Sequence, residues 1–126
     1  MRLLFVCVGN SCRSQMAESI ANSLGHEAHS AGTEPSNEVS KNAILALRER
    51  GYPTGNLVPK SIDEVYPSDF DLIISMGCGV SCPSVPIDID WGLEDPVGQG
   101  LQVFRETRDE IFSKIRDLPI GSSTDE

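Results

Sequence analysis

The chain has 126 residues, 39% of them hydrophobic, and a formal net charge of -9 at pH 7. This length predicts one domain that can bury a core without disulfides, and the acidic balance argues against nucleic acid and anionic membranes as partners. No apolar stretch approaches the ~18 residues of a membrane helix, and the first strand leaves no room for a signal peptide, so we expect a cytoplasmic protein and, by default, a monomer.

Apolar runs alternate with helical patterns along the chain, which is typical of a parallel sheet with helices on both faces. The sequence therefore predicts a single α/β domain over residues 1–118, followed by a disordered tail over 119–126. In the last helix, charged residues such as Arg108 and Asp109 are expected to be solvated. The predicted elements are a strand over 3–6, a helix over 14–24, a strand over 28–30, a helix over 39–50, a strand over 71–76 and a helix over 104–118.

The most informative segment is Val-Cys-Val-Gly-Asn-Ser-Cys-Arg-Ser at 6–14, in which five residues separate Cys7 from Arg13. Cys7 falls where the first strand ends, so the loop's backbone N–H groups and the start of the next helix can hold a tetrahedral oxyanion. Arg13 can bind two of its oxygens. In such a field the pKa of a cysteine falls from ~8.5 to between ~3.5 and ~7.5, which produces a nucleophilic thiolate. The expected substrate-binding residues are Val8, Gly9, Asn10, Ser11, Cys12, Arg13 and Ser14.

This segment resembles the phosphate loop of the low-molecular-weight protein tyrosine phosphatase superfamily, which is Cys-x5-Arg followed by Ser or Thr. Asn10 matches the asparagine that braces the loop, and Ser14 matches the hydroxyl that hydrogen-bonds the thiolate. Asp95-Pro96 matches the pair that supplies the general acid, which contributes roughly 10²- to 10⁴-fold to a rate. The resemblance extends nearly to Leu118 and implies a phosphatase-like fold with a central four-stranded parallel sheet.

Within the superfamily, two segments are closer to the arsenate reductases. Ser14 is followed by Gln-Met-Ala-Glu, where phosphatases more often carry a proline. Asp95 is followed by Pro-Val-Gly, where phosphatases place aromatic residues. The resemblance therefore implies a reductase of the thioredoxin-linked type, with arsenate as substrate, phosphate and sulfate as competing oxyanions, and weak phosphatase activity.

Cys78 and Cys82 form a second cysteine pair, and a two-electron reduction needs such additional thiols. By resemblance, Cys7 attacks arsenate, Cys78 attacks the Cys7 adduct to release arsenite, and Cys82 takes over the disulfide for reduction by thioredoxin. Only three residues separate this pair, fewer than in the thioredoxin-linked pattern, so a low-molecular-weight thiol with a glutaredoxin-like protein is a competing reductant. Cys78 and Cys82 could instead be buried structural residues, and for Cys12 packing is favoured over a protective disulfide with Cys7.

Two further functions remain open: a phosphatase that works through a phosphocysteine and water, and a phosphocysteine carrier or oxyanion sensor that catalyses no hydrolysis. We expect no bound cofactor and no metal, because the two histidines and four cysteines match no common zinc site. Some members of the superfamily bind potassium at positions that match Asn10, Glu18 and Ser30. Here Lys60 stands at the position of the fourth ligand, an aspartate, so we expect its charge to replace the ion.

Overall fold

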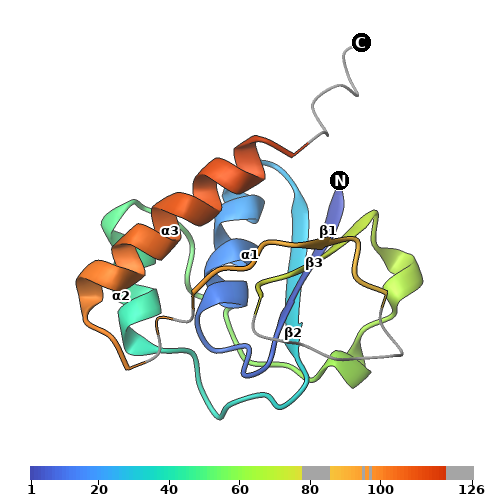
Figure 1. Ribbon diagram of the computed structural model, residues 1–126, viewed down its shortest axis with the longest axis horizontal. Helices are drawn as coiled ribbons and strands as arrows, with labels where there is room; N and C mark the ends of the chain where they lie inside the picture. The colour runs from blue at the N-terminus through green and yellow to red at the C-terminus, as the bar shows by residue number, and fades with distance from the viewer. Residues whose placement is uncertain (78–85, 95, 97, 119–126) are drawn as a thin grey trace.

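The structure, a computed structural model, describes residues 1–77, 86–94, 96 and 98–118 (Figure 1). Its centre is a parallel sheet with the strand order β2-β1-β3-β4, which confirms the predicted α/β class and four-stranded sheet. The strands are β1 (Arg2–Cys7), β2 (Glu27–Gly32), β3 (Leu72–Ser75) and β4 (Ile89–Asp90), and the α-helices are α1 (Arg13–Ser23), α2 (Lys41–Glu49) and α3 (Leu101–Arg116). The two-residue strand β4 was not predicted. The predicted tail, 119–126, lies outside the described residues.

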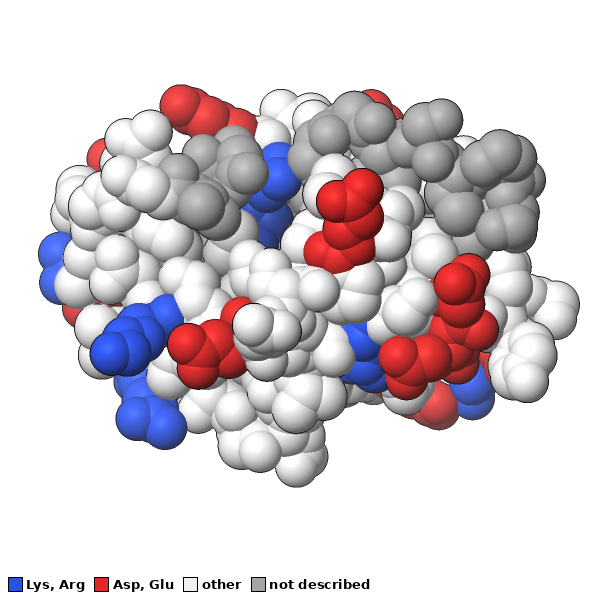
Figure 2. Space-filling view, turned by 90° about the horizontal axis from the view of Figure 1, so that it is seen from below, with Lys and Arg blue, Asp and Glu red and all other residues white. Residues whose placement is uncertain are grey.

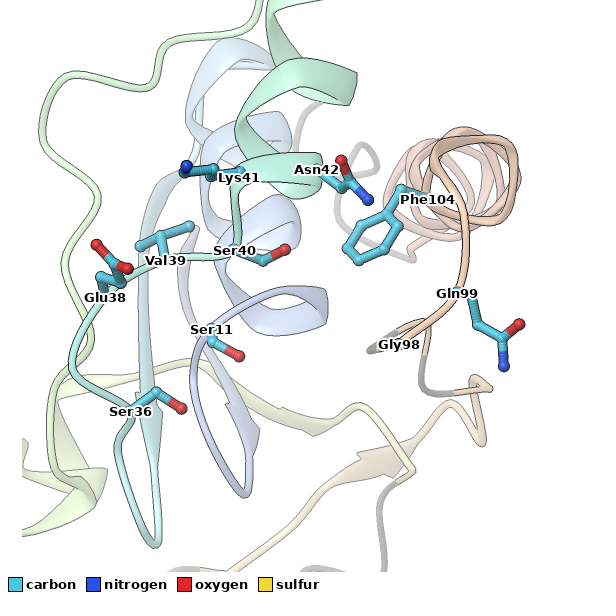
Figure 3. Close-up of a pocket in the computed structure, with 10 residues that line it drawn as sticks. All are labelled: Ser11, Ser36, Glu38, Val39, Ser40, Lys41, Asn42, Gly98, Gln99 and Phe104. Atoms are coloured by element: carbon cyan, nitrogen blue, oxygen red, sulfur yellow. The ribbon is translucent and has the colours of Figure 1, made fainter.

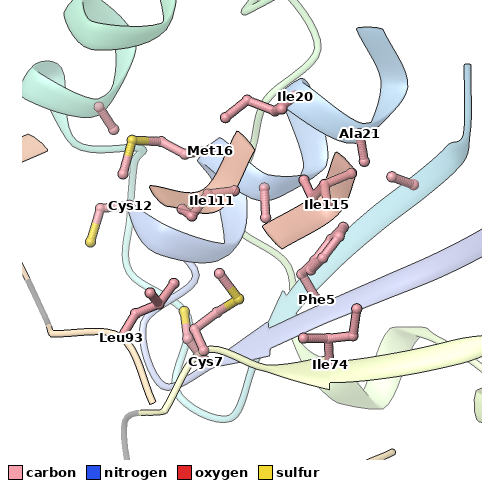
Figure 4. Packing of buried hydrophobic residues seen from close by; sticks show 14 of the residues in the cluster. Phe5, Cys7, Cys12, Met16, Ile20, Ala21, Ile74, Leu93, Ile111 and Ile115 are labelled. Carbon is pink, nitrogen blue, oxygen red and sulfur yellow. The ribbon is translucent and has the colours of Figure 1, made fainter. Parts of the chain in front are cut away.

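The two faces of the sheet bury different sets of side chains. Alternate β1 residues Leu3, Phe5 and Cys7 belong to one apolar cluster with α1, α2 and α3 (Figure 4). Leu4 and Val6 belong to a second cluster on the opposite face. Helices cover both faces, as predicted, but among the described residues the second face has only two short 3-10 helices, Ile62–Glu64 and Pro67–Asp69. No helix in this described part is long and apolar enough to cross a membrane.

Cys7 lies at the carboxyl end of its strand, where there is little space for the loop that follows. β1 is an inner strand and ends at Cys7, whose register partner on β2 is Gly32. A Cβ atom at Gly32 would lie only 2.5 Å from the carbonyl oxygen of Val8, so a side chain there would displace the loop that follows Cys7. Glycine at the end of β2 therefore allows this loop to fold back against the sheet.

The prediction that Arg108 is solvated is wrong. Only 3% of Arg108 is exposed, and its Nη1 donates hydrogen bonds to Ala46 O and Glu49 Oε1, each at 2.9 Å. These contacts join α3 to the last turn of α2, whose carbonyl groups lack partners within the helix. Hydrogen bonds from Arg105 and then from Arg108 lower the pKa of the Glu49 carboxyl. Arg108 is thus part of the packing between two helices.

We expect Arg108→Ala to lower the free energy of unfolding by about 2 to 4 kcal/mol, because it leaves buried acceptors without their charged donor. Urea unfolding measures this loss. Arg116→Ala is the matched control, since the Arg116 side chain is 61% exposed and its removal should change stability by no more than about 0.5 kcal/mol. Equal losses in the two variants would contradict the structural role of Arg108.

Candidate active site

The loop between β1 and α1 surrounds the sulfur of Cys7 with hydrogen-bonding groups. Cys7 is 3% exposed, and its Sγ lies 2.9 Å from Ser14 Oγ. The backbone N–H of Asn10 donates to the same sulfur at 3.2 Å. Hydrogen bonds to the charged form of a thiol favour that form, and the start of α1 adds the positive end of a helix dipole. The geometry is therefore suited to hold Cys7 as a thiolate.

The Ser14 hydroxyl also contacts the asparagine beside it. Asn10 Nδ2 donates to Ser14 Oγ at 2.8 Å, and an amide nitrogen cannot accept. The Ser14 oxygen therefore accepts from Asn10, and its own hydrogen remains available to a Cys7 thiolate, which can only accept. The hydrogen bonds from Asn10 to Ser14 and between Ser14 and Cys7 therefore suit a thiolate, and the roles assigned to these three residues from the sequence stay predictions.

Asn10 also fastens the loop to a distant segment. Its φ is 51°, the left-handed conformation that asparagine tolerates better than most residues. Its Oδ1 accepts from the backbone N–H of Lys60 at 2.8 Å and from Gln15 Nε2 at 3.0 Å. Gln15 Nε2 also donates to the carbonyl oxygens of Asn10 and Val58. The bracing by Gln15 was not predicted, and its only sequence signal is a long polar side chain on the buried side of a helix.

We expect Asn10→Ala and Asn10→Gly to raise the pH at which Cys7 reacts with iodoacetamide, because both remove the side chain that orients Ser14. Asn10→Ala should be the less stable of the two by about 1 kcal/mol, since glycine adopts a positive φ without strain. Urea unfolding separates that backbone effect from the effect on the thiol. An unchanged pH profile of alkylation in both variants would contradict the proposed hydrogen-bond chain.

Arg13 is held by the ends of two other segments. It is 3% exposed, and its Nη1 donates to Leu93 O at 2.9 Å and to Met76 O at 3.4 Å. Met76 directly follows β3, and Leu93 comes shortly after β4. Because a guanidinium has five N–H donors, these bonds can fix its plane while other N–H groups bind an oxyanion. The sheet and the loop therefore position Arg13 together.

The other residues singled out from the sequence fall into two groups. Cys12 is 3% exposed and belongs to the same apolar cluster as Cys7, which agrees with a packing role (Figure 4). Cys78, Cys82 and Asp95 lie outside the described residues, so their catalytic roles stay predictions.

Lys60 lies beside Glu18, which occupies one of the positions that match potassium ligands. Ser30 Oγ donates to Glu18 Oε1 at 2.6 Å, and Lys60 Nζ is 3.6 Å from the same oxygen. In the described ranges, no group of three or more His, Cys, Asp and Glu side chains could hold a metal ion. The replacement of a potassium ion by the Lys60 charge remains a prediction.

Charge is scattered over the face seen from below in Figure 2. Acidic side chains lie at several places on it, and the basic side chains form no broad patch there, although some of them adjoin at the lower left. With a net charge of -9, the protein's overall field repels an oxyanion. Attraction must therefore come from the loop amides, the start of α1 and Arg13.

Comparison with known proteins agrees with this geometry. The family model for low molecular weight phosphotyrosine protein phosphatases matches residues 2–82. The chain belongs to this family. A glutaredoxin arsenate reductase of Synechocystis sp. is 39% identical over 125 residues, covering 93% of this chain and 95% of the relative.

Solved structures of the family show the same fold. An arsenate reductase in the phosphate binding state superposes with a TM-score of 0.85 at 39% identity, covering 93% of this chain and 95% of the other. A thioredoxin-dependent arsenate reductase of Corynebacterium glutamicum has a TM-score of 0.77 at 32% identity, covering 98% of this chain and 63% of the other. The placement in the arsenate reductase branch of the family is thereby confirmed.

Proposed function

We propose that this protein reduces arsenate to arsenite with Cys7 as the nucleophile. One observation carries the proposal: a chain similar to arsenate reductases over nearly its whole length holds the sulfur of Cys7 between the Asn10 N–H and the Ser14 hydroxyl. Arsenate has the tetrahedral shape and charge of phosphate, so loop amides and Arg13 suit either oxyanion. Phosphate and sulfate are expected to compete with arsenate.

The first step joins sulfur to arsenic. The Cys7 thiolate attacks arsenate, an S–As bond forms, and one oxygen leaves as water after taking a proton from Asp95. The Cys78 thiolate then attacks Cys7 Sγ, and the S–As bond breaks. Its electron pair leaves with arsenic, which is thereby reduced to arsenite, while the two sulfurs are oxidised to a disulfide. Cys82 exchanges with this disulfide and releases the Cys7 thiolate.

The cycle closes when an external thiol reduces the disulfide. Two reductants are compatible with the residues: a thioredoxin-like protein that attacks Cys82 or Cys78, or a low-molecular-weight thiol followed by a glutaredoxin-like protein. The name of the Synechocystis relative supports the second route, and that of the Corynebacterium relative supports the first. Either reductant requires a reducing compartment, so we propose that the enzyme works in the cytoplasm. We also propose that it acts as a monomer and without a bound cofactor.

The test is a single turnover with excess arsenate and no reductant. We expect about one arsenite per wild-type chain and none from Cys78→Ser, because only a second thiol in the chain can release arsenite as a disulfide forms. Cys82→Ser should still give one arsenite and should accumulate the Cys7–Cys78 disulfide. Cys12→Ser is the control for a thiol outside the relay: its rate can change, because Cys12 lies in the loop, but it should still give about one arsenite per chain.

Other outcomes would change the proposal. If wild type makes arsenite only when a small thiol is added, that thiol, and not Cys78, releases the product. If no reductant yields arsenite, the second candidate is favoured: a phosphatase, as the family model's name suggests, in which water hydrolyses a phosphocysteine. That candidate also predicts that Cys78→Ser leaves p-nitrophenyl phosphate turnover unchanged. Weak phosphatase activity alone would not distinguish the two, because the same loop can bind phosphate esters.

A further inference from the structure

The phosphate loop has different surroundings at two neighbouring residues. Ser11 borders a pocket of about 450 Å³, whose other walls are residues 36–42 before and at the start of α2 and residues 98–104 at the start of α3 (Figure 3). Asn10 is 0% exposed, and its side chain receives hydrogen bonds from α1 and from the segment 58–60. The fold therefore encloses the loop at Asn10 and leaves it accessible at Ser11.

Gln15 holds Asn10 through a single amide group. It lies in the first turn of α1 and is 0% exposed. Its Nε2 donates to Asn10 O and Asn10 Oδ1, each at 3.0 Å, and to Val58 O at 2.7 Å. Because an amide nitrogen has two hydrogens, two of these three acceptors share one of them. One group thus contacts the backbone and the side chain of Asn10 together.

The same amide also holds the segment that supplies the second donor to Asn10. The backbone N–H of Lys60 donates to Asn10 Oδ1 at 2.8 Å, and Lys60 is two residues beyond Val58. Ser19, one helical turn after Gln15, donates from its Oγ to the carbonyl oxygen of Pro53, at the other end of this segment. Both donors to Asn10 Oδ1 therefore depend on the polar face of α1.

The orientation of the Asn10 amide determines which of its atoms faces Ser14. With Oδ1 held by two donors, Nδ2 is directed at Ser14 Oγ, 2.8 Å away. An Asn10 amide turned by 180° would place Oδ1 at Ser14, and the Ser14 hydroxyl would then donate to Asn10. In the observed orientation that hydrogen stays available to Cys7 Sγ at 2.9 Å. Gln15 therefore influences the sulfur although it does not touch it.

The stability of the Gln15 side chain does not by itself account for a glutamine here. Its Oε1 is buried and has no hydrogen-bond partner among the described residues. A buried oxygen without a donor is unfavourable, and an apolar side chain of similar length would avoid it. The three bonds of Nε2 are what this residue adds to the site.

We propose that Gln15 is a positioning residue for the nucleophile: by fixing the Asn10 amide it keeps the Ser14 hydroxyl available to the Cys7 thiolate. The inference rests on the proposed function, in which Cys7 attacks the substrate. Its effect is on the reactivity of the thiol, so it can be measured without arsenate.

The test is the pH profile of Cys7 alkylation by iodoacetamide in the full, reduced chain, with fragment-ion mass spectrometry to separate Cys7 from Cys12. We expect Gln15→Met to raise the midpoint of the profile by about 0.5 to 1, which slows alkylation about 3- to 10-fold below the midpoint. Gln102→Met is the matched control, because Gln102 is exposed on α3, and its midpoint should equal that of wild type.

A double-mutant cycle tests whether Gln15 acts through Asn10. In an Asn10→Gly background, Gln15→Met should change the alkylation rate by less than about twofold, since the amide that Gln15 orients is already gone. Equal slowing in both backgrounds would overturn the inference, and so would an unchanged midpoint for Gln15→Met alone.

A measurement on wild type covers the case in which Gln15→Met does not unfold cooperatively. The side-chain amide resonances of Asn10 and Gln15 should both shift with pH at the midpoint found for Cys7 alkylation. A shift at Asn10 without one at Gln15 would overturn the inference, because the sulfur would then be coupled to Asn10 alone.

The two proposals fail in different ways. If wild type yields arsenite in a single turnover but Gln15→Met leaves the alkylation profile unchanged, arsenate reduction stands and the role of Gln15 is wrong. If no arsenite forms under any reductant but Gln15→Met moves the profile only when Asn10 is present, Gln15 positions the thiolate and the proposed reaction is wrong.

Discussion

Replacing Cys7 with serine is expected to eliminate arsenite formation, with a loss of at least about 10³-fold in turnover. A serine hydroxyl is a far weaker acid than a thiol, so hydrogen bonds such as those from Ser14 and the Asn10 N–H would not ionise it near neutral pH. Even an oxygen adduct with arsenic could not proceed, because oxygen cannot form the disulfide that supplies two electrons. The measurement is arsenite released per chain in a single turnover.

The control for this variant is its affinity for phosphate, measured by calorimetry. The loop amides and Arg13 remain in place, so phosphate binding should change by only a few fold while the reduction is lost. Arsenite formed by Cys7→Ser at the wild-type level would show that another thiol is the nucleophile. Loss of both phosphate binding and cooperative unfolding would instead indicate that the loop had collapsed.

Arg13→Lys is expected to lower kcat/KM for arsenate by about 10²- to 10³-fold. The guanidinium is anchored by Leu93 O and Met76 O, and it has further N–H groups for the oxyanion. A lysine ammonium is a single point that cannot hold the two carbonyls and two substrate oxygens in one plane. Steady-state kinetics with arsenate, and phosphate as a competing ligand, measure the loss.

Arg50→Lys serves as the control for that substitution, because the Arg50 side chain is 59% exposed and far along the chain from the loop. It should leave kcat/KM within about twofold of wild type, as surface substitutions usually do. A decrease of less than threefold for Arg13→Lys would show that the positive charge alone, rather than the shape of the guanidinium, serves the reaction.

The local order of the chain was enough to predict the centre of the site. A strand that ends at Cys7, a loop and a helix that begins near Ser14 are set by neighbouring residues, and the structure places them at Arg2–Cys7 and Arg13–Ser23. That Asn10 and Ser14 lie beside Cys7 could be predicted by resemblance for the same reason, since they contact Cys7 from within the same short segment.

Other features depend on segments that meet only in the folded chain. The sequence pattern placed Arg108 on a solvated face because neighbouring charges surround it, but the last turn of α2 covers it and accepts its hydrogen bonds. The pairing of β4 with β3 depends on a register that two residues cannot specify by themselves. Gln15 joins the loop to Val58 only because that distant segment returns to it in the folded chain.

The sequence by itself thus determined the fold class, the phosphate loop and the family, because these follow from residue order over short stretches. Only the tertiary structure decided which distant carbonyls hold Arg13, which helix buries Arg108, and which three segments enclose the pocket beside Ser11. The physical reason is that hydrogen bonds and burial between distant segments depend on how the chain packs. The sequence pattern shows which hydrogen bonds and apolar contacts each side chain can make, and packing determines the partner with which it makes them.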